Sequence, residues 1–157
     1  MTNNDILRQI RYIWDFSDEK MIKLFALGEY EVTRAMVSNW LKKEDDEQFE
    51  NLEDPELAIF LNGLIVKLRG KKEGPLPKPE DPLTNNMILR KLKIALNLKS
   101  EDMIEVLALT GFRLGQHELT AFFRKPDQRQ FRPCKDQVLR KFLYGLKLKI
   151  RGTDEQS

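Results

Sequence analysis

The sequence predicts an all-α protein made of two tandem four-helix modules, and three observations support this fold class. The chain repeats itself, its apolar residues recur at helical spacing, and a proline-rich segment separates the two copies. Apolar residues make up 41% of the chain, which is enough for a packed core. No segment alternates apolar and polar residues over a useful length, so no sheet of note is expected.

The internal repeat is the strongest of these signals. Residues 2–70 align with residues 84–152 without a gap, and 24 of the 69 aligned positions are identical. Such self-similarity is typical of a duplicated structural unit. It predicts a first helical repeat over residues 1–70, a Pro-rich linker over residues 71–83, a second helical repeat over residues 84–152 and a C-terminal tail over residues 153–157.

The linker holds four prolines between Pro75 and Pro82. Proline fixes φ and removes an amide donor, so neither a helix nor a central strand is expected here. An extended spacer of the polyproline type is the first interpretation. The alternative is a ligand motif for an SH3-like groove, with the spacing Pro79-x-x-Pro82.

Each copy is expected to hold four helices, because apolar residues recur at three- and four-residue spacing. In the first copy, Ser17 and Thr33 are predicted caps for the second and third helices. Asp54 is the predicted cap of the fourth helix, with Pro55 as its first residue, and Gly70 is expected to end it in a left-handed conformation. The predicted apolar faces of these three helices contain Met21, Leu24, Phe25, Leu27, Met36, Val37, Trp40, Leu41, Leu57, Phe60, Leu61, Leu64 and Leu68.

Catalytic and metal-binding motifs are missing from the sequence. The chain has one histidine, His117, and one cysteine, Cys134, whereas zinc sites and nucleophilic triads need several such residues at set spacing. There is no glycine-rich phosphate-binding motif. The acidic run at residues 44–47 is expected to be solvated. The chain is therefore expected to be no enzyme, with no catalytic residue, no cofactor and no metal.

The sequence also predicts a cytoplasmic protein without a membrane partner. The first residues lack the basic and apolar regions of a signal peptide. The apolar runs are far shorter than the roughly 20 residues of a membrane span. A lone cysteine suits a reducing compartment.

One segment of each copy resembles the recognition helix of repressor-type helix-turn-helix domains. In the first copy this segment is residues 33–43, where an apolar face would pack on the domain and a polar, basic face would meet DNA. The alternative is an ordinary helical bundle whose third helix has a polar outer face. The predicted nucleic-acid-binding residues are Arg34, Ser38, Asn39, Lys42, Lys43, Gln116, Thr120, Arg124, Lys125 and Arg129.

Three features depart from that motif. The turn before the third helix is longer than the usual three or four residues, and the glycine shifts from Gly28 in the first copy to Gly111 in the second. The acidic run at residues 44–47 would repel phosphates. The second copy suits DNA better, because a basic cluster surrounds Phe131 there: Arg124, Lys125, Arg129, Arg132 and Lys135.

The charge distribution is uneven. Residues 1–81 hold 12 basic and 17 acidic residues, a net of −5, while residues 82–157 hold 15 and 8, a net of +7. This asymmetry indicates either a basic half that binds a partner or two halves that attract each other. A second repeated pattern is polar, and we interpret its members mainly as helix caps and pairing groups, with a shared ligand pocket as the alternative: Asn3/Asn85, Asn4/Asn86, Arg8/Arg90, Gln48/Gln130 and Arg69/Arg151.

Several segments carry a family resemblance: TNNDILRQIRY, MIKLFALGEYEVTRAMVSNWLKKEDD, FLNGLIVKLRGKKEG, LTNNMILRKLKIALNLKSEDMIEVLALTGF and FRKPDQRQFRPCKDQVLRKFLYGL. Over essentially residues 1–152 the chain resembles the uncharacterised bacterial YehS-like family. The resemblance implies a duplicated small helical domain in a bacterial cytosolic protein, and it implies no activity. Glu29, which aligns with Gly111, is the position where a changed turn would show.

Taken together, the sequence favours a non-enzymatic helical binding module. Nucleic acid, bound through helix-turn-helix-like third helices, is one expected partner. The alternative is a protein–protein interaction module or a homodimer that does not bind nucleic acid.

Overall fold

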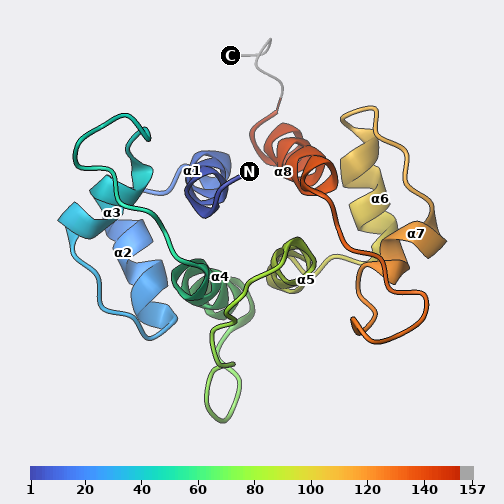
Figure 1. Cartoon of the computed structure of the whole chain (residues 1–157), viewed down its shortest axis with the longest axis horizontal. Coiled ribbons are helices and arrows are strands. Elements are labelled where there is room, and N and C mark those ends of the chain that lie inside the picture. The colour runs from blue at the N-terminus through green and yellow to red at the C-terminus, as the bar shows by residue number, and fades with distance from the viewer. Residues whose placement is uncertain (153–157) are drawn as a thin grey trace. The chain divides into compact units, whose positions relative to one another are not determined.

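The computed structural model describes residues 1–152, which form eight helices and no strand (Figure 1). The predicted all-α class is confirmed. The chain divides into two compact units, residues 1–83 and the residues from Thr84 onward. The tail predicted at residues 153–157 lies outside the described residues.

Each unit contains four helices in the same order. In the first unit, α2 packs on both α3 and α4, and α1 contacts α3 and α4. In the second unit, α6 packs on α7 and α8, and α5 contacts α8. The first unit has α1 (Asn3–Trp14), α2 (Asp18–Leu27), α3 (Arg34–Leu41) and α4 (Asp54–Arg69), and the second has α5 (Asn85–Ala95), α6 (Ser100–Ala108), α7 (Gln116–Ala121) and α8 (Asp136–Arg151).

The helix starts follow local capping chemistry. Ser17 Oγ accepts from the N–H of Lys20 at 3.1 Å, and Thr33 Oγ1 accepts from the N–H of Met36 at 3.1 Å, so both predicted caps are confirmed. These bonds satisfy amide groups that have no partner inside the helix.

The first helix of each unit begins with a threonine cap. Thr2 Oγ1 accepts from the N–H of Asp5 at 3.0 Å, and Thr84 Oγ1 accepts from the N–H of Met87 at 3.2 Å. The repeated asparagines that follow are therefore not caps, and their interpretation as caps was wrong. Their side chains instead reach other parts of the fold.

The fourth helix begins one residue earlier than predicted. Glu53 is the cap residue, Asp54 is the first helical residue and Pro55 is the second. The Asp54 carboxylate does not cap the helix, because it accepts from the side chain of Asn3 at 2.7 Å and from the N–H of Leu83 at 2.9 Å. The cap assignment to Asp54 was therefore wrong. Gly70 ends the helix with the expected positive φ, of 87°, but its ψ of 160° lies outside the left-handed helical region.

The core of the first unit is aromatic. The Phe25 ring lies 5.0 Å from the Phe60 ring and 5.1 Å from the Trp40 ring, between centroids. Both phenylalanine side chains are fully buried. Leu68, which was predicted on the same apolar face, is 43% exposed, as its neighbours in the last turn of α4, Lys67 and Arg69, are also exposed.

A glycine lets the second and fourth helices of each unit touch backbone to backbone. A Cβ on Gly63 of α4 would lie 1.8 Å from the carbonyl oxygen of Leu24 in α2. A Cβ on Gly145 of α8 would lie 2.3 Å from the carbonyl oxygen of Val106 in α6. No real side chain fits at such distances, so these helix pairs require glycine.

The proline-rich segment contains neither helix nor strand and groups with the first unit. Its end is attached to α4 by the bond from Leu83 to Asp54. The segment is therefore tethered to the first unit where it reaches the second repeat.

Candidate functional site

The third helix of each unit ends earlier than the sequence predicted. α3 stops at Leu41, so Lys42 and Lys43 lie beyond it, and Lys42 has extended backbone angles of φ −70° and ψ 162°. α7 stops at Ala121 after only six residues. The placement of Lys42, Lys43, Arg124 and Lys125 on recognition helices was therefore wrong, whereas Arg34 is the first residue of α3. Arg124, Lys125 and Arg129 lie in the loop after α7.

Side chains from α1 explain where α3 ends. The last carbonyl groups of a helix have no partner within it and need another donor. The side-chain amide of Asn4 donates to the carbonyl of Trp40 at 2.8 Å, and Arg8 Nη1 donates to the carbonyl of Lys42 at 2.9 Å. These donors come from a helix far away in the sequence, so the end of α3 is set by tertiary contacts.

Asn4 also fixes the loop that follows α3. Its amide donates to the carbonyl of Glu50 at 2.9 Å, and its Oδ1 accepts from the N–H of Leu52 at 3.0 Å. The side chain is fully buried. Because both the amide N–H groups and the oxygen of Asn4 are hydrogen-bonded, this side chain fixes the positions of the three backbone groups that it contacts. We call this arrangement the asparagine clamp.

The second unit repeats the asparagine clamp with Asn86. Its amide donates to the carbonyls of Phe122 and Arg132, both at 2.9 Å, and its Oδ1 accepts from the N–H of Cys134 at 2.8 Å. Each of these partners aligns with its counterpart in the first unit when the two repeats are superposed in sequence. The polar side-chain atoms of Asn4 and Asn86 are all bonded within the clamp, so these atoms do not support the alternative of a ligand pocket.

The neighbouring asparagines bind the start of the fourth helix. Asn3 donates to the carbonyl of Leu52 at 3.0 Å as well as to Asp54. Asn85 donates to the carbonyl of Cys134 at 3.0 Å and to the Asp136 carboxylate at 2.7 Å. This bond from Asn85 holds the pKa of Asp136 below its ordinary value.

The loops after the third helices share one backbone framework. We call residues 42–50 the acidic loop and residues 124–132 the basic loop. Each loop is closed by corresponding backbone hydrogen bonds. They are Asp46 to Lys43, Phe49 to Asp46 and Glu50 to Asn39 in the acidic loop, and Gln128 to Lys125, Phe131 to Gln128 and Arg132 to Ala121 in the basic loop.

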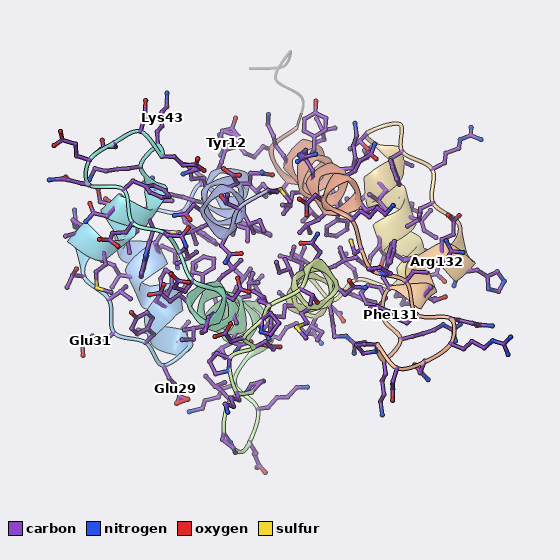
Figure 2. All side chains as sticks on the ribbon, in the orientation of Figure 1. Tyr12, Glu29, Glu31, Lys43, Phe131 and Arg132 are labelled. Carbon is purple, nitrogen blue, oxygen red and sulfur yellow. The ribbon has the colours of Figure 1, made fainter. Side chains whose placement is uncertain are left out.

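On this shared framework the charges are reversed. The acidic loop holds two lysines and five acids, a net of −3. The basic loop holds two arginines at the counterparts of Glu47 and Glu50, namely Arg129 and Arg132, and its net charge is +3 from four basic residues and one aspartate. Figure 2 labels Lys43 on the acidic loop and Phe131 and Arg132 on the basic loop.

The basic loop and α7 enclose an open pocket of about 400 Å³. Three guanidinium groups and a half-buried aromatic ring line it, together with one carboxylate, that of Glu118. Glu118 Oε1 accepts from the N–H of Gly115 at 3.0 Å, so this carboxylate is engaged at the start of α7. The lining residues are His117, Glu118, Ala121, Arg124, Arg129, Gln130, Phe131 and Arg132.

The arginines of this basic pocket have no internal counterion within residues 1–152. Arg124, Arg129 and Arg132 form no ion pair there, and Arg124 Nε is buried without an acceptor. A pocket in the first unit, lined by Arg8 and Arg11 among others, differs in this respect. Its arginines are engaged with carboxylates and with backbone carbonyls of the same unit. Unpaired guanidinium groups in a pocket are suited to bind an anion such as phosphate.

The predicted residues of the first unit do not form a comparable surface. Lys42 Nζ donates to Ser38 Oγ at 3.2 Å and to Asn39 Oδ1 at 2.9 Å, so these three side chains satisfy one another. Arg34 is exposed, 3.7 Å from a Glu19 carboxylate oxygen. Lys43 is exposed and directly precedes the acidic run.

In the second unit the structure brings together Arg124 and Arg129 but not the other predicted residues. Gln116 and Lys125 are exposed outside the pocket lining, and Thr120 Oγ1 donates to the carbonyl of His117. The predicted nucleic-acid-binding residues omitted four residues that line the pocket, although two of them, Phe131 and Arg132, belonged to the basic cluster noted in the sequence. Aligning the repeats singles out Arg132 among them, since this arginine stands where the first copy has a glutamate. The four are His117, Gln130, Phe131 and Arg132.

The described part of the chain has no metal-binding group, and its one cysteine is buried. Residues 1–152 contain no group of three or more His, Cys, Asp or Glu side chains placed to hold a metal ion. Burial, with the charge of Asp136, raises the pKa of Cys134 to about 11, so its thiol stays protonated. No helix in the same residues has the length and apolar character needed to cross a membrane.

The fold and the pocket together define a duplicated all-helical protein that carries a basic pocket in its second unit. The chain belongs to the family described as "Protein of unknown function (DUF1456)", which matches it twice, over residues 3–70 and 85–152. It is 45% identical over 147 residues to "Uncharacterized protein YehS" of Escherichia coli (strain K12), covering 93% of this chain and 94% of that protein. The resemblance found in the sequence is thus confirmed. No solved structure matches the chain significantly.

Proposed function

We propose that the protein is a non-enzymatic binding module that holds nucleic acid in the basic pocket of its second unit. The observation that carries the proposal is the group of three arginines without internal counterions beside Phe131. Guanidinium groups bind phosphate oxygens in a bidentate manner, and an aromatic ring offers a face on which a base stacks. This combination favours a single-stranded segment.

The length of α7 supports the same preference. A recognition helix enters the major groove of a duplex and presents side chains from successive turns. α7 has six residues, and the basic side chains follow it in a loop. A loop with arginines and an aromatic ring suits a flexible strand better than a duplex groove. A cytosolic location fits both this ligand and the single free cysteine.

The direct test is fluorescence anisotropy with a labelled single strand and a labelled duplex, at about 50 and 200 mM salt. We expect tighter binding of the single strand. Its affinity should fall with salt at a logarithmic slope near −2, because about three phosphate contacts release counterions at roughly 0.7 each. No binding of either probe at the lower salt concentration contradicts the proposal.

A matched pair of variants separates the pocket from net charge. Arg124→Glu with Arg129→Glu changes two pocket residues, whereas Arg34→Glu with Lys43→Glu makes the same charge change in the first unit. We expect the pocket variant to lose at least about tenfold in affinity, and the control to lose no more than about threefold. Equal losses would mean that binding follows net charge alone.

A further inference from the structure

The two loops of opposite charge are complementary in position as well as in sign. Glu47 and Glu50 of the acidic loop are three residues apart, as are Arg129 and Arg132 of the basic loop. The corresponding backbone bonds and the asparagine clamp hold both pairs on the same framework. The two glutamates and the two arginines therefore stand at corresponding positions of the same backbone geometry.

Both loops also lack internal counterions. The acids of the acidic loop are exposed and form no ion pair within residues 1–152. One of them, Asp46, accepts from the N–H of Gln48 at 2.8 Å, which leaves its charge in place. Each loop thus carries a net charge that no ion pair within residues 1–152 offsets, and a group of the opposite sign would stabilise it.

We propose that the acidic loop of one molecule docks into the basic pocket of a second copy of this chain. Glu47 and Glu50 would face Arg129 and Arg132 of the other copy. The exposed Asp45 adds a further carboxylate to the same loop. The partner is a second copy because the chain itself carries both complementary surfaces, with net charges of −3 and +3. This inference goes beyond the proposed function, and it rests on the charge reversal between the repeats rather than on nucleic-acid binding.

The contact joins two different surfaces, so it generates either a closed assembly or an open chain. It also places carboxylates where the proposed function places phosphates. Self-association and nucleic-acid binding therefore compete for one pocket, and bound nucleic acid should release the second copy.

Charge reversal provides the test, with native mass measured by light scattering at about 50 and 500 mM salt over a range of protein concentrations. The wild type should exceed the mass of a single chain at the lower salt concentration and return to it at the higher. Arg129→Glu with Arg132→Glu makes both loops acidic, and Glu47→Arg with Glu50→Arg makes both basic. Each variant alone should be monomeric at low salt.

Mixing the two reversed variants is the decisive step. One supplies acidic loops and the other basic pockets, so the mixture should form a complex although neither variant assembles alone. Circular dichroism of each variant, matched to the wild type, shows that the loss of assembly is not unfolding. A wild type of monomer mass at every concentration, or a mixture that stays monomeric, overturns the proposal.

The same variants distinguish this inference from the proposed function. Glu47→Arg with Glu50→Arg should abolish self-association while nucleic-acid binding is kept or strengthened. Arg129→Glu with Arg132→Glu should abolish both. Assembly that survives both reversals runs through another surface and also overturns the inference, whatever the outcome with nucleic acid.

Discussion

Asn4 makes three hydrogen bonds inside the first unit, and an apolar side chain could replace none of them. Asn4→Ala would leave two carbonyl groups and one N–H without partners, each worth about 1–3 kcal/mol when buried. We expect the free energy of unfolding to fall by about 3 kcal/mol, measured by urea denaturation. The matched control is Asn51→Ala, because Asn51 is exposed. Equal stability of the two variants would show that the asparagine clamp does not hold the loop.

Glu29 adopts a backbone conformation that favours glycine. Its φ is 70°, and its counterpart Gly111 has a φ of 78°, so the turn after the second helix is kept in both units. A side chain in this region costs roughly 1 kcal/mol or somewhat more. Glu29→Gly should therefore raise the melting temperature. Glu31→Gly, at a nearby exposed position with negative φ that is also labelled in Figure 2, should not raise it.

Cys134 is expected to make the free energy of unfolding decrease as the pH becomes alkaline. Its thiol pKa rises from 9.0 to about 11 on folding, mainly through burial. The folded state keeps the proton where the unfolded state loses it, so its contribution is full below pH 9 and is lost as pH rises towards about 11. Unfolding at a series of pH values should show a decrease of roughly 2–3 kcal/mol over that window. Cys134→Ala should remove this part of the pH dependence, and an unchanged profile would contradict the cause.

At the scale of elements, two helix pairs depend on one glycine each. Gly63→Ala would force α2 and α4 apart, because the added Cβ would lie 1.8 Å from a backbone oxygen. We expect a loss of about 3 kcal/mol in unfolding free energy, and a similar loss for Gly145→Ala. Lys67→Ala, on an exposed position of α4, should change stability by no more than about 0.5 kcal/mol. An alanine variant as stable as this control would mean that the helices separate at no cost.

The starts of α2 and α3 could be predicted from the sequence because their capping is local. Ser17 and Thr33 bond to amides three residues away, so the signal and its effect lie in one short segment. The end of α3 could not be predicted in this way. It depends on Asn4 and Arg8, which lie on α1 and reach their partners across the fold rather than along the chain.

The residue types of the candidate site could be predicted from the sequence, but the pocket that they line could not. The sequence showed a basic cluster around Phe131, yet it placed Arg124 and Lys125 on a recognition helix. A pocket formed because α7 is short and the basic loop folds back to it, with the Arg132 N–H bonded to the Ala121 carbonyl. Such a loop closure depends on the asparagine clamp, which local periodicity does not reveal.

At the scale of the whole molecule, a small net charge hides a strong separation of charge. The chain carries +2 overall, although its two halves carry −5 and +7. We expect retention on a heparin column to follow the basic pocket more than this sum. Arg129→Glu with Arg132→Glu should elute at clearly lower salt than Lys20→Glu with Lys23→Glu, which makes the same change in net charge on α2. Co-elution of the two variants would show that heparin senses only total charge.

The asparagine clamp has an evolutionary consequence. Because the side chain of one asparagine holds the loop by its backbone, the side chains of that loop can change without loss of the fold. A gene duplication then provides two positions for the same loop, and mutation can take one towards acid and the other towards base. The present chain carries one acidic and one basic loop, and both are held by the same asparagine clamp, which sets the geometry of the backbone and not the charge.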